Sequence, residues 1–144
     1  MKKLLLIFIF PFFGWSKPLD FNRDVRPILS DKCFSCHGPD EHGRKADLRL
    51  DIEKEAKHED LMAIVAGKPD ESEMIYRIHS EEEEELMPPP EIGKPLSQRE
   101  KEILEQWIKE GAIWADHWAY VDPVKHSQPQ VIDSNWPTHW IDQF

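Results

Sequence analysis

Apolar residues recur at helical spacing in several short stretches of the chain, and the clearest of these lies between residues 98 and 110. Ser97 and Glu100 form the pattern of a capping box before it, and Gly111 follows its final turn. One apolar face is formed by Ile103, Leu104, Trp107 and Ile108. The pattern predicts an amphipathic helix whose apolar face must pack against another part of the molecule.

A second helix is predicted where Val25, Ile28 and Leu29 recur at helical spacing. Pro27 is compatible with this helix only near its start, because only the first turn has amide hydrogens without partners. Asp24 is therefore expected to be the N-cap.

A third helix is expected after Asp70, which with Glu73 resembles a capping box. Met74 and Ile78 then lie on one helical face, so Met74 is predicted to be a core residue. Met62 lies in a short apolar run and is predicted to be buried as well.

The pattern as a whole predicts a small all-α domain over residues 19–115. Residues 116–144 contain many Trp, His and Pro residues with little periodicity, and we expect an irregular, extended tail there. No internal repeat is found.

The first sixteen residues have the pattern of a secretory signal peptide. Lys2 and Lys3 precede an apolar stretch of residues 4–13, and Gly14 and Ser16 offer small side chains for cleavage after Ser16. A membrane-spanning helix needs ~20 apolar residues, which is more than this stretch offers. We expect an exported protein, periplasmic or extracytoplasmic, without stable membrane insertion after cleavage.

The chain is strongly acidic, with 28 Asp and Glu against 18 Lys and Arg and a net charge of -10. Nucleic acid is an unfavourable partner, since binding phosphates requires a basic surface. Residues 81–85 are five consecutive glutamates, which indicate either a solvated loop or a docking patch for a basic partner.

The two cysteines of the chain lie in the sequence Cys33-Phe34-Ser35-Cys36-His37. The pattern C-x-x-C-H is the attachment motif for c-type haem. Two thiols three positions apart can add to the two vinyl groups of a haem, and the following histidine then becomes the proximal iron ligand. We expect one haem c per chain, bound covalently by Cys33 and Cys36 and ligated by His37.

Other uses of this cysteine pair remain open. A thioredoxin-like redox pair also has C-x-x-C, but it follows a strand, and no alternating β-branched run precedes Cys33. A plain disulfide would suit an oxidising compartment. A zinc site would require a second pair of ligands, and no second cysteine pair exists.

Met87 is the expected distal ligand, because it stands directly before Pro88, Pro89 and Pro90. A proline run cannot continue a helix and holds an extended backbone that can fix a thioether over the distal face. A histidine such as His79, or an open position, are the alternatives.

His/Met ligation favours single-electron transfer over catalysis, since both oxidation states keep the same ligands. We therefore predict an electron-transfer protein with a redox partner protein, and not an enzyme. An open distal position would favour a peroxidase-like haem enzyme instead, and a haem-free protein would favour a thiol–disulfide oxidoreductase.

The chain resembles the planctomycete-type cytochrome c domain in several blocks that occur in order. The blocks are residues 21–40, which include the cysteine motif, and residues 44–51, 67–72, 77–78, 87–89, 94–96, 107–108, 111–112 and 117–119. The resemblance implies a class I-like cytochrome c fold, haem on Cys33 and Cys36, and axial ligation by His37 and Met87.

Two features depart from the family. The acidic run before Met87 is heavier than expected, which would lengthen that loop. Such domains usually open longer multidomain proteins, and residues 135–144 resemble the start of the following domain. Whether the chain is a fragment of such a protein stays open.

Overall fold

The computed structural model describes residues 19–124, 127, 129–132, 135–136 and 138–143. The expected signal peptide, residues 1–16, lies outside this part of the chain, and so do some positions of the expected tail.

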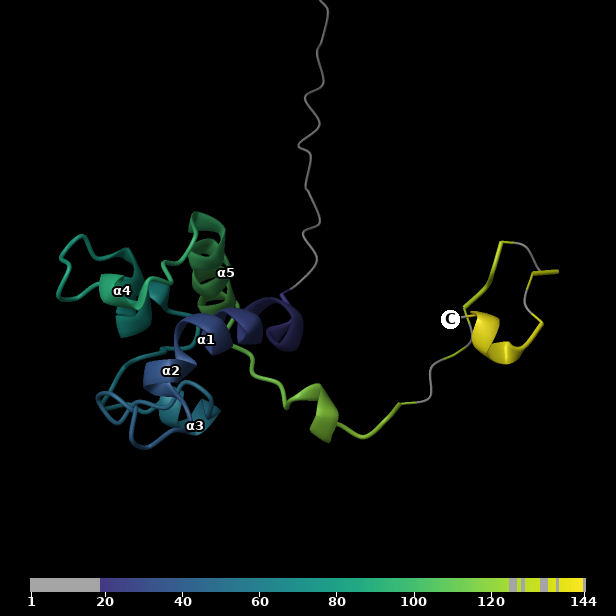
Figure 1. Ribbon diagram of the computed structural model, residues 1–144, viewed down its shortest axis with the longest axis horizontal. Helices are drawn as coiled ribbons and strands as arrows, with labels where there is room; N and C mark the ends of the chain where they lie inside the picture. Colours follow the sequence, from purple (N-terminus) through teal and green to yellow (C-terminus); the bar gives the residue numbers. More distant parts are fainter. Residues whose placement is uncertain (1–18, 125–126, 128, 133–134, 137, 144) are drawn as a thin grey trace, which may run out of the picture.

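Within the described residues, all regular elements are helices or single helical turns, as the all-α prediction requires. They are η1 (Phe21–Val25), α1 (Arg26–Lys32), α2 (Phe34–His37), α3 (Glu53–Ala56), η2 (Pro69–Glu71), α4 (Glu73–His79), η3 (Pro90–Ile92), α5 (Gln98–Lys109), η4 (Trp118–Tyr120) and η5 (Trp140–Gln143). Figure 1 shows α4 and α5 on one side of the domain and α2 and α3 on the other, with α1 between them.

The first helix begins earlier than the sequence predicted. Asp20, and not Asp24, is the N-cap, and its side chain accepts a hydrogen bond from the Arg23 amide. The first turn, η1, is a π-helical turn in which the Arg26 amide donates to the carbonyl of Phe21. Such a wide turn accommodates Pro27, which has no amide hydrogen to donate in the following turn.

Helix α5 matches its prediction in its start, its end and its buried face. The Ser97 hydroxyl accepts from the Glu100 amide, and the Glu100 carboxylate accepts from the Ser97 amide at 2.7 Å. Gly111 has a φ of +101°, which glycine adopts without steric cost. Leu104, Trp107 and Ile108 are buried.

The apolar face of α5 packs against η1 and α4. An aromatic cluster of Phe21, Trp107 and Trp114 joins the two ends of the domain, with ring centroids 4.7–5.6 Å apart. Such aromatic pairs add about 0.5–1.5 kcal/mol each beyond their burial. The Arg26 guanidinium lies over the Phe21 ring and also donates to the carbonyl of Ala115 at 2.7 Å. These contacts fasten the chain that leaves α5 to the first helix.

Two predictions near α4 are wrong. The helix begins at Glu73 after the 3-10 turn η2, so Asp70 and Glu73 do not form a capping box. The buried Ser72 hydroxyl accepts a hydrogen bond from the Val65 amide and donates one to the Lys68 carbonyl. These two bonds close the loop that precedes α4. Met62 is 46% exposed and not a core residue, whereas Met74 is buried as predicted.

Replacing the N-cap of α5 tests the importance of this helix. We expect Ser97→Ala to lower the free energy of unfolding by about 1 kcal/mol, because the Glu100 amide loses its partner. Arg99→Ala, at an exposed position of the same first turn, should change it by less than about 0.5 kcal/mol. Urea unfolding measures both, and equal effects of the two variants would contradict the role of the cap.

Candidate haem-binding site

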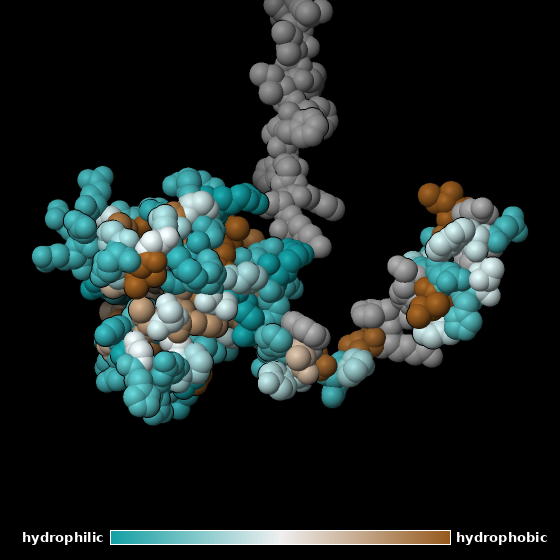
Figure 2. Space-filling model, in the orientation of Figure 1, coloured by the Kyte–Doolittle hydropathy of each residue, from teal (hydrophilic) through white to brown (hydrophobic). Residues whose placement is uncertain are grey.

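A cavity of about 460 Å³ lies between the two sides of the domain. One wall carries Cys33, Cys36 and His37, and the other carries Met74 and Met87. In Figure 2, hydrophilic residues cover most of the visible face, and apolar residues gather between the region of α4 and that of α2 and α3. The volume lies within the range of about 300–1,000 Å³ that is typical of cofactor sites.

The cysteine motif forms a single helical turn that continues the direction of the first helix. The Cys33 amide donates to the Leu29 carbonyl at 2.9 Å, and the His37 amide donates to the Cys33 carbonyl at 2.8 Å. Gly38 ends this turn, and a Cβ atom there would lie only 2.3 Å from the Phe34 carbonyl oxygen. The turn places both thiols and the imidazole at the cavity, as the motif predicted.

The imidazole of His37 is oriented by a backbone carbonyl. Its Nδ1 lies 3.2 Å from the Lys45 carbonyl oxygen. A carbonyl only accepts hydrogen bonds, so Nδ1 must hold the proton and donate it. The Nε2 atom of the neutral ring then keeps its lone pair, which is the form that binds a metal.

The loop after the motif is fixed directly to it. The Lys45 amide donates to the Cys36 carbonyl, and the Leu50 amide donates to the His37 carbonyl, both at 2.8 Å. Between these bonds, Ala46 and Asp47 have φ values of +54° and +51°. This left-handed backbone costs roughly 1–2 kcal/mol per residue. These two residues directly follow Lys45, whose carbonyl oxygen orients His37. Strained backbone of this kind is often found at functional sites.

Burial changes the acid–base properties of the motif. It raises the pKa of the Cys33 thiol to about 12, with the nearby Cys36 adding to the effect and Lys32 opposing it. Burial also lowers the pKa of His37, against the hydrogen bond to Lys45, and the charge of Arg77 lowers it further. At neutral pH, Cys33 is therefore a thiol and His37 is a neutral imidazole.

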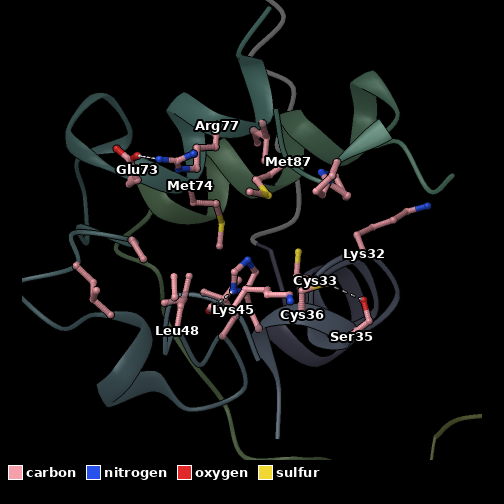
Figure 3. Close-up of a pocket in the computed structure, with 18 of the residues that line it drawn as sticks. Lys32, Cys33, Ser35, Cys36, Lys45, Leu48, Glu73, Met74, Arg77 and Met87 are labelled. Carbon is pink, nitrogen blue, oxygen red and sulfur yellow. Dashed lines mark hydrogen bonds and ion pairs between the residues drawn. The ribbon is translucent and has the colours of Figure 1, made fainter. Parts of the chain in front are cut away.

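Two thioethers, and not one, face the motif. The sulfur atoms of Met74 and Met87 both point into the cavity toward the wall that carries Cys33 and Cys36 (Figure 3). The Met87 amide donates to the Arg77 carbonyl at 3.1 Å, which joins the end of the acidic loop to α4. His79 does not line this cavity, and its Nε2 lies 3.8 Å from a carboxylate oxygen of Glu105.

Helix α5 contributes no residue to the cavity lining. Its apolar face, which the sequence predicted to pack against another part of the molecule, is covered by η1 and α4.

An ion pair joins α1 to the segment after the prolines. The Lys94 ammonium, from the segment after the prolines, donates to the Asp31 carboxylate at 2.7 Å and to the Asp31 carbonyl at 3.3 Å. Asp31 stands on α1, two residues before Cys33. The hydrogen bond from Lys94 lowers the pKa of Asp31, and Lys32 lowers it further. We call this contact the Asp31–Lys94 latch.

Sequence reasoning did not single out Lys45, Arg77 or Asp31 as parts of the site. Lys45 acts through its carbonyl group, which every residue possesses, so its side chain gives no signal. Asp31, Lys45 and Arg77 all lie in blocks that resemble the cytochrome c family.

The latch predicts how stability depends on pH. The pKa of Asp31 is lower in the folded protein than its ordinary value of 3.8. The stabilisation is therefore complete above that value and is lost as the pH falls through the lower, folded pKa. Asp31→Asn should lower the urea midpoint at neutral pH, and this deficit should shrink as the pH falls from about 4 toward 2.

Lys94→Gln should reproduce most of the deficit, because Lys94 is the main cause of the shift. A deficit that is the same at every pH would contradict the latch.

Residues 33–91 match the family model described as Planctomycete cytochrome C. The match contains the cysteine motif, Met74 and Met87. No curated relative and no solved structure matches the chain. Within the described ranges, no helix has the length and apolar character needed to cross a membrane. For residues 33–91, the match supports the planctomycete-type cytochrome c domain that the sequence resembles.

Proposed function

We propose that the chain is a c-type cytochrome that transfers single electrons through one covalently attached haem c. The observation that carries the proposal is the apolar cavity that brings Cys33, Cys36 and His37 together on one wall, opposite Met87. His37 and Met87 are 50 positions apart in the chain, yet both border one apolar space.

The residues at the cavity fit a haem. Both cysteines are free thiols, as thioether attachment requires. The chemistry that a bound haem supplies is reversible one-electron transfer at its iron. His37 would provide Nε2 as the proximal ligand, and the Lys45 carbonyl would keep its ring in the required tautomer. Met87 would provide a soft thioether, which favours the ferrous state.

The apolar lining would exclude water from the iron and so lower the reorganisation that accompanies electron transfer. No bond to a protein residue changes in the proposed step, and one electron enters or leaves for each encounter with a partner. A peroxidase-like reaction requires an open distal position. Because two thioethers face that position, electron transfer is the better supported function.

The cavity chemistry also weighs against the alternatives without haem. A redox-active C-x-x-C pair depends on a thiolate of low pKa, whereas the pKa of Cys33 is raised to about 12. Among the described residues, no three His, Cys, Asp or Glu side chains gather as a metal site would require.

Cytochrome c domains are typically extracytoplasmic, and we propose that this protein is exported by the signal peptide expected at residues 1–16. Its redox partner is proposed to be a basic protein. The first four glutamates of the acidic run, residues 81–84, are exposed, so their charge is available at the surface near Met87.

Covalent haem attachment is the first test. After expression with a working cytochrome c maturation system, intact mass should show the mature polypeptide plus one haem, and acid–acetone extraction should leave this mass unchanged. Cys33→Ala/Cys36→Ala should lose the haem under the same extraction. A wild-type polypeptide without added haem would end the proposal.

The distal ligand is tested by replacing the thioether with an imidazole. Met87→His should abolish the weak red absorption band of ferric iron–thioether ligation and lower the reduction potential by on the order of 0.2 V, within the ~0.8 V range that axial ligands control. Met62→His is the matched control, because Met62 is largely exposed and does not line the cavity. Imidazole binds ferric iron more strongly than a thioether does, so a histidine in place of Met87 should prevail over any other sulfur at the cavity. An unchanged band and potential in Met87→His would show that position 87 does not reach the iron.

A further inference from the structure

Two methionines face the same wall of the cavity, and the proposed function uses only one of them. Met74 was predicted to be a core residue, and it is one, with 9% of its surface exposed. Unlike Ile78, the other buried residue of α4, it brings a sulfur atom to the cavity (Figure 3). Leucine would fill the core equally well, whereas a thioether is also a soft metal ligand.

The two methionines are held very differently. Met74 lies in the first turn of α4, and its amide donates to the Ala63 carbonyl at 3.1 Å. Glu73, just before it, is also bonded to the loop at residue 62, through a 2.9 Å hydrogen bond. The helix and this loop together fix the position of Met74.

Met87 lies outside any helix, at the end of the acidic loop. At its end the loop is joined to α4, because the Met87 amide donates to the Arg77 carbonyl at 3.1 Å and the Tyr76 hydroxyl donates to the Glu85 carboxylate. Its other bonds are short-range, such as those that the amides of Glu85 and Leu86 donate to the Glu82 carbonyl. Five adjacent carboxylates repel one another, and segments with few buried contacts open most readily. On the distal wall, the Met87 segment is therefore the one expected to move away first.

We propose that Met74 is a reserve thioether ligand, which takes the sixth coordination position when Met87 withdraws. This inference rests on the proposed haem-binding function. It predicts that loss of Met87 leaves the iron ligated by sulfur and closed to small external ligands. The acidic loop could then move during partner binding without converting the site into an open, peroxide-reactive one.

The test uses the haem-loaded ferric protein in four forms: wild type, Met74→Leu, Met87→Ala and Met87→Ala/Met74→Leu. The Met74→Leu change conserves volume and should keep the fold. The readouts are the red iron–thioether band, the spin state and the affinity for added imidazole. Met62→Ala is the control for a methionine away from the cavity, and circular dichroism confirms helical content in every form.

We expect the band and the low-spin state to persist in Met87→Ala and in Met74→Leu, and to disappear only in the double variant. Imidazole should bind the double variant at least about tenfold more tightly than it binds Met87→Ala, because no internal sulfur competes.

A Met87→Ala protein that is already high-spin and binds imidazole as tightly as the double variant would overturn the reserve role while leaving Met87 as the ligand. Loss of the band in Met74→Leu alone would identify Met74 as the resident ligand and would also overturn it. An unchanged double variant would overturn it because neither sulfur ligates. Absence of attached haem in the wild type is a separate result, which rejects the proposed function itself.

Discussion

The contact between His37 Nδ1 and the Lys45 carbonyl decides what the imidazole can do, because a carbonyl accepts hydrogen bonds and never donates them. The proton is held on Nδ1, and the Nε2 atom of the neutral ring keeps its lone pair. The same loop is bonded to the backbone of Cys36 and His37. The positions of Cys36 and His37 and the orientation of the imidazole thus depend on one short segment, which accepts left-handed backbone at Ala46 and Asp47.

The domain separates the core that stabilises it from the cavity that gives it chemistry. The aromatic cluster and the buried face of α5 join the beginning of the domain to its end, and α5 does not reach the cavity. The two cavity walls can therefore differ in stiffness without loss of the fold. One wall is a helical turn with a bonded loop, and the other combines α4 with a loop that ends in prolines.

Charge is distributed in accordance with this division. The Asp31–Lys94 latch is an exposed ion pair, and such a pair contributes little to stability but joins one segment to another. The acidic run stands on the surface beside the more weakly held methionine. An encounter with a basic partner would then act on the segment that can move, and not on the proximal wall.

The sequence by itself determined the features that depend on neighbours in the chain. The cysteine motif, the capping box of Ser97 and Glu100 and the apolar face of α5 were all predicted, because their geometry is set within one or a few helical turns. The match to Planctomycete cytochrome C confirms the family resemblance over residues 33–91.

The tertiary structure decided what depends on contacts between distant segments. Sequence patterns predicted Met62 and Met74 alike as core residues, yet only Met74 reaches the cavity, since the fold turns Met62 to the solvent. The start of the first helix at Asp20 was likewise missed. An apolar side chain shows that burial is favourable, but only the folded chain determines which surface buries it.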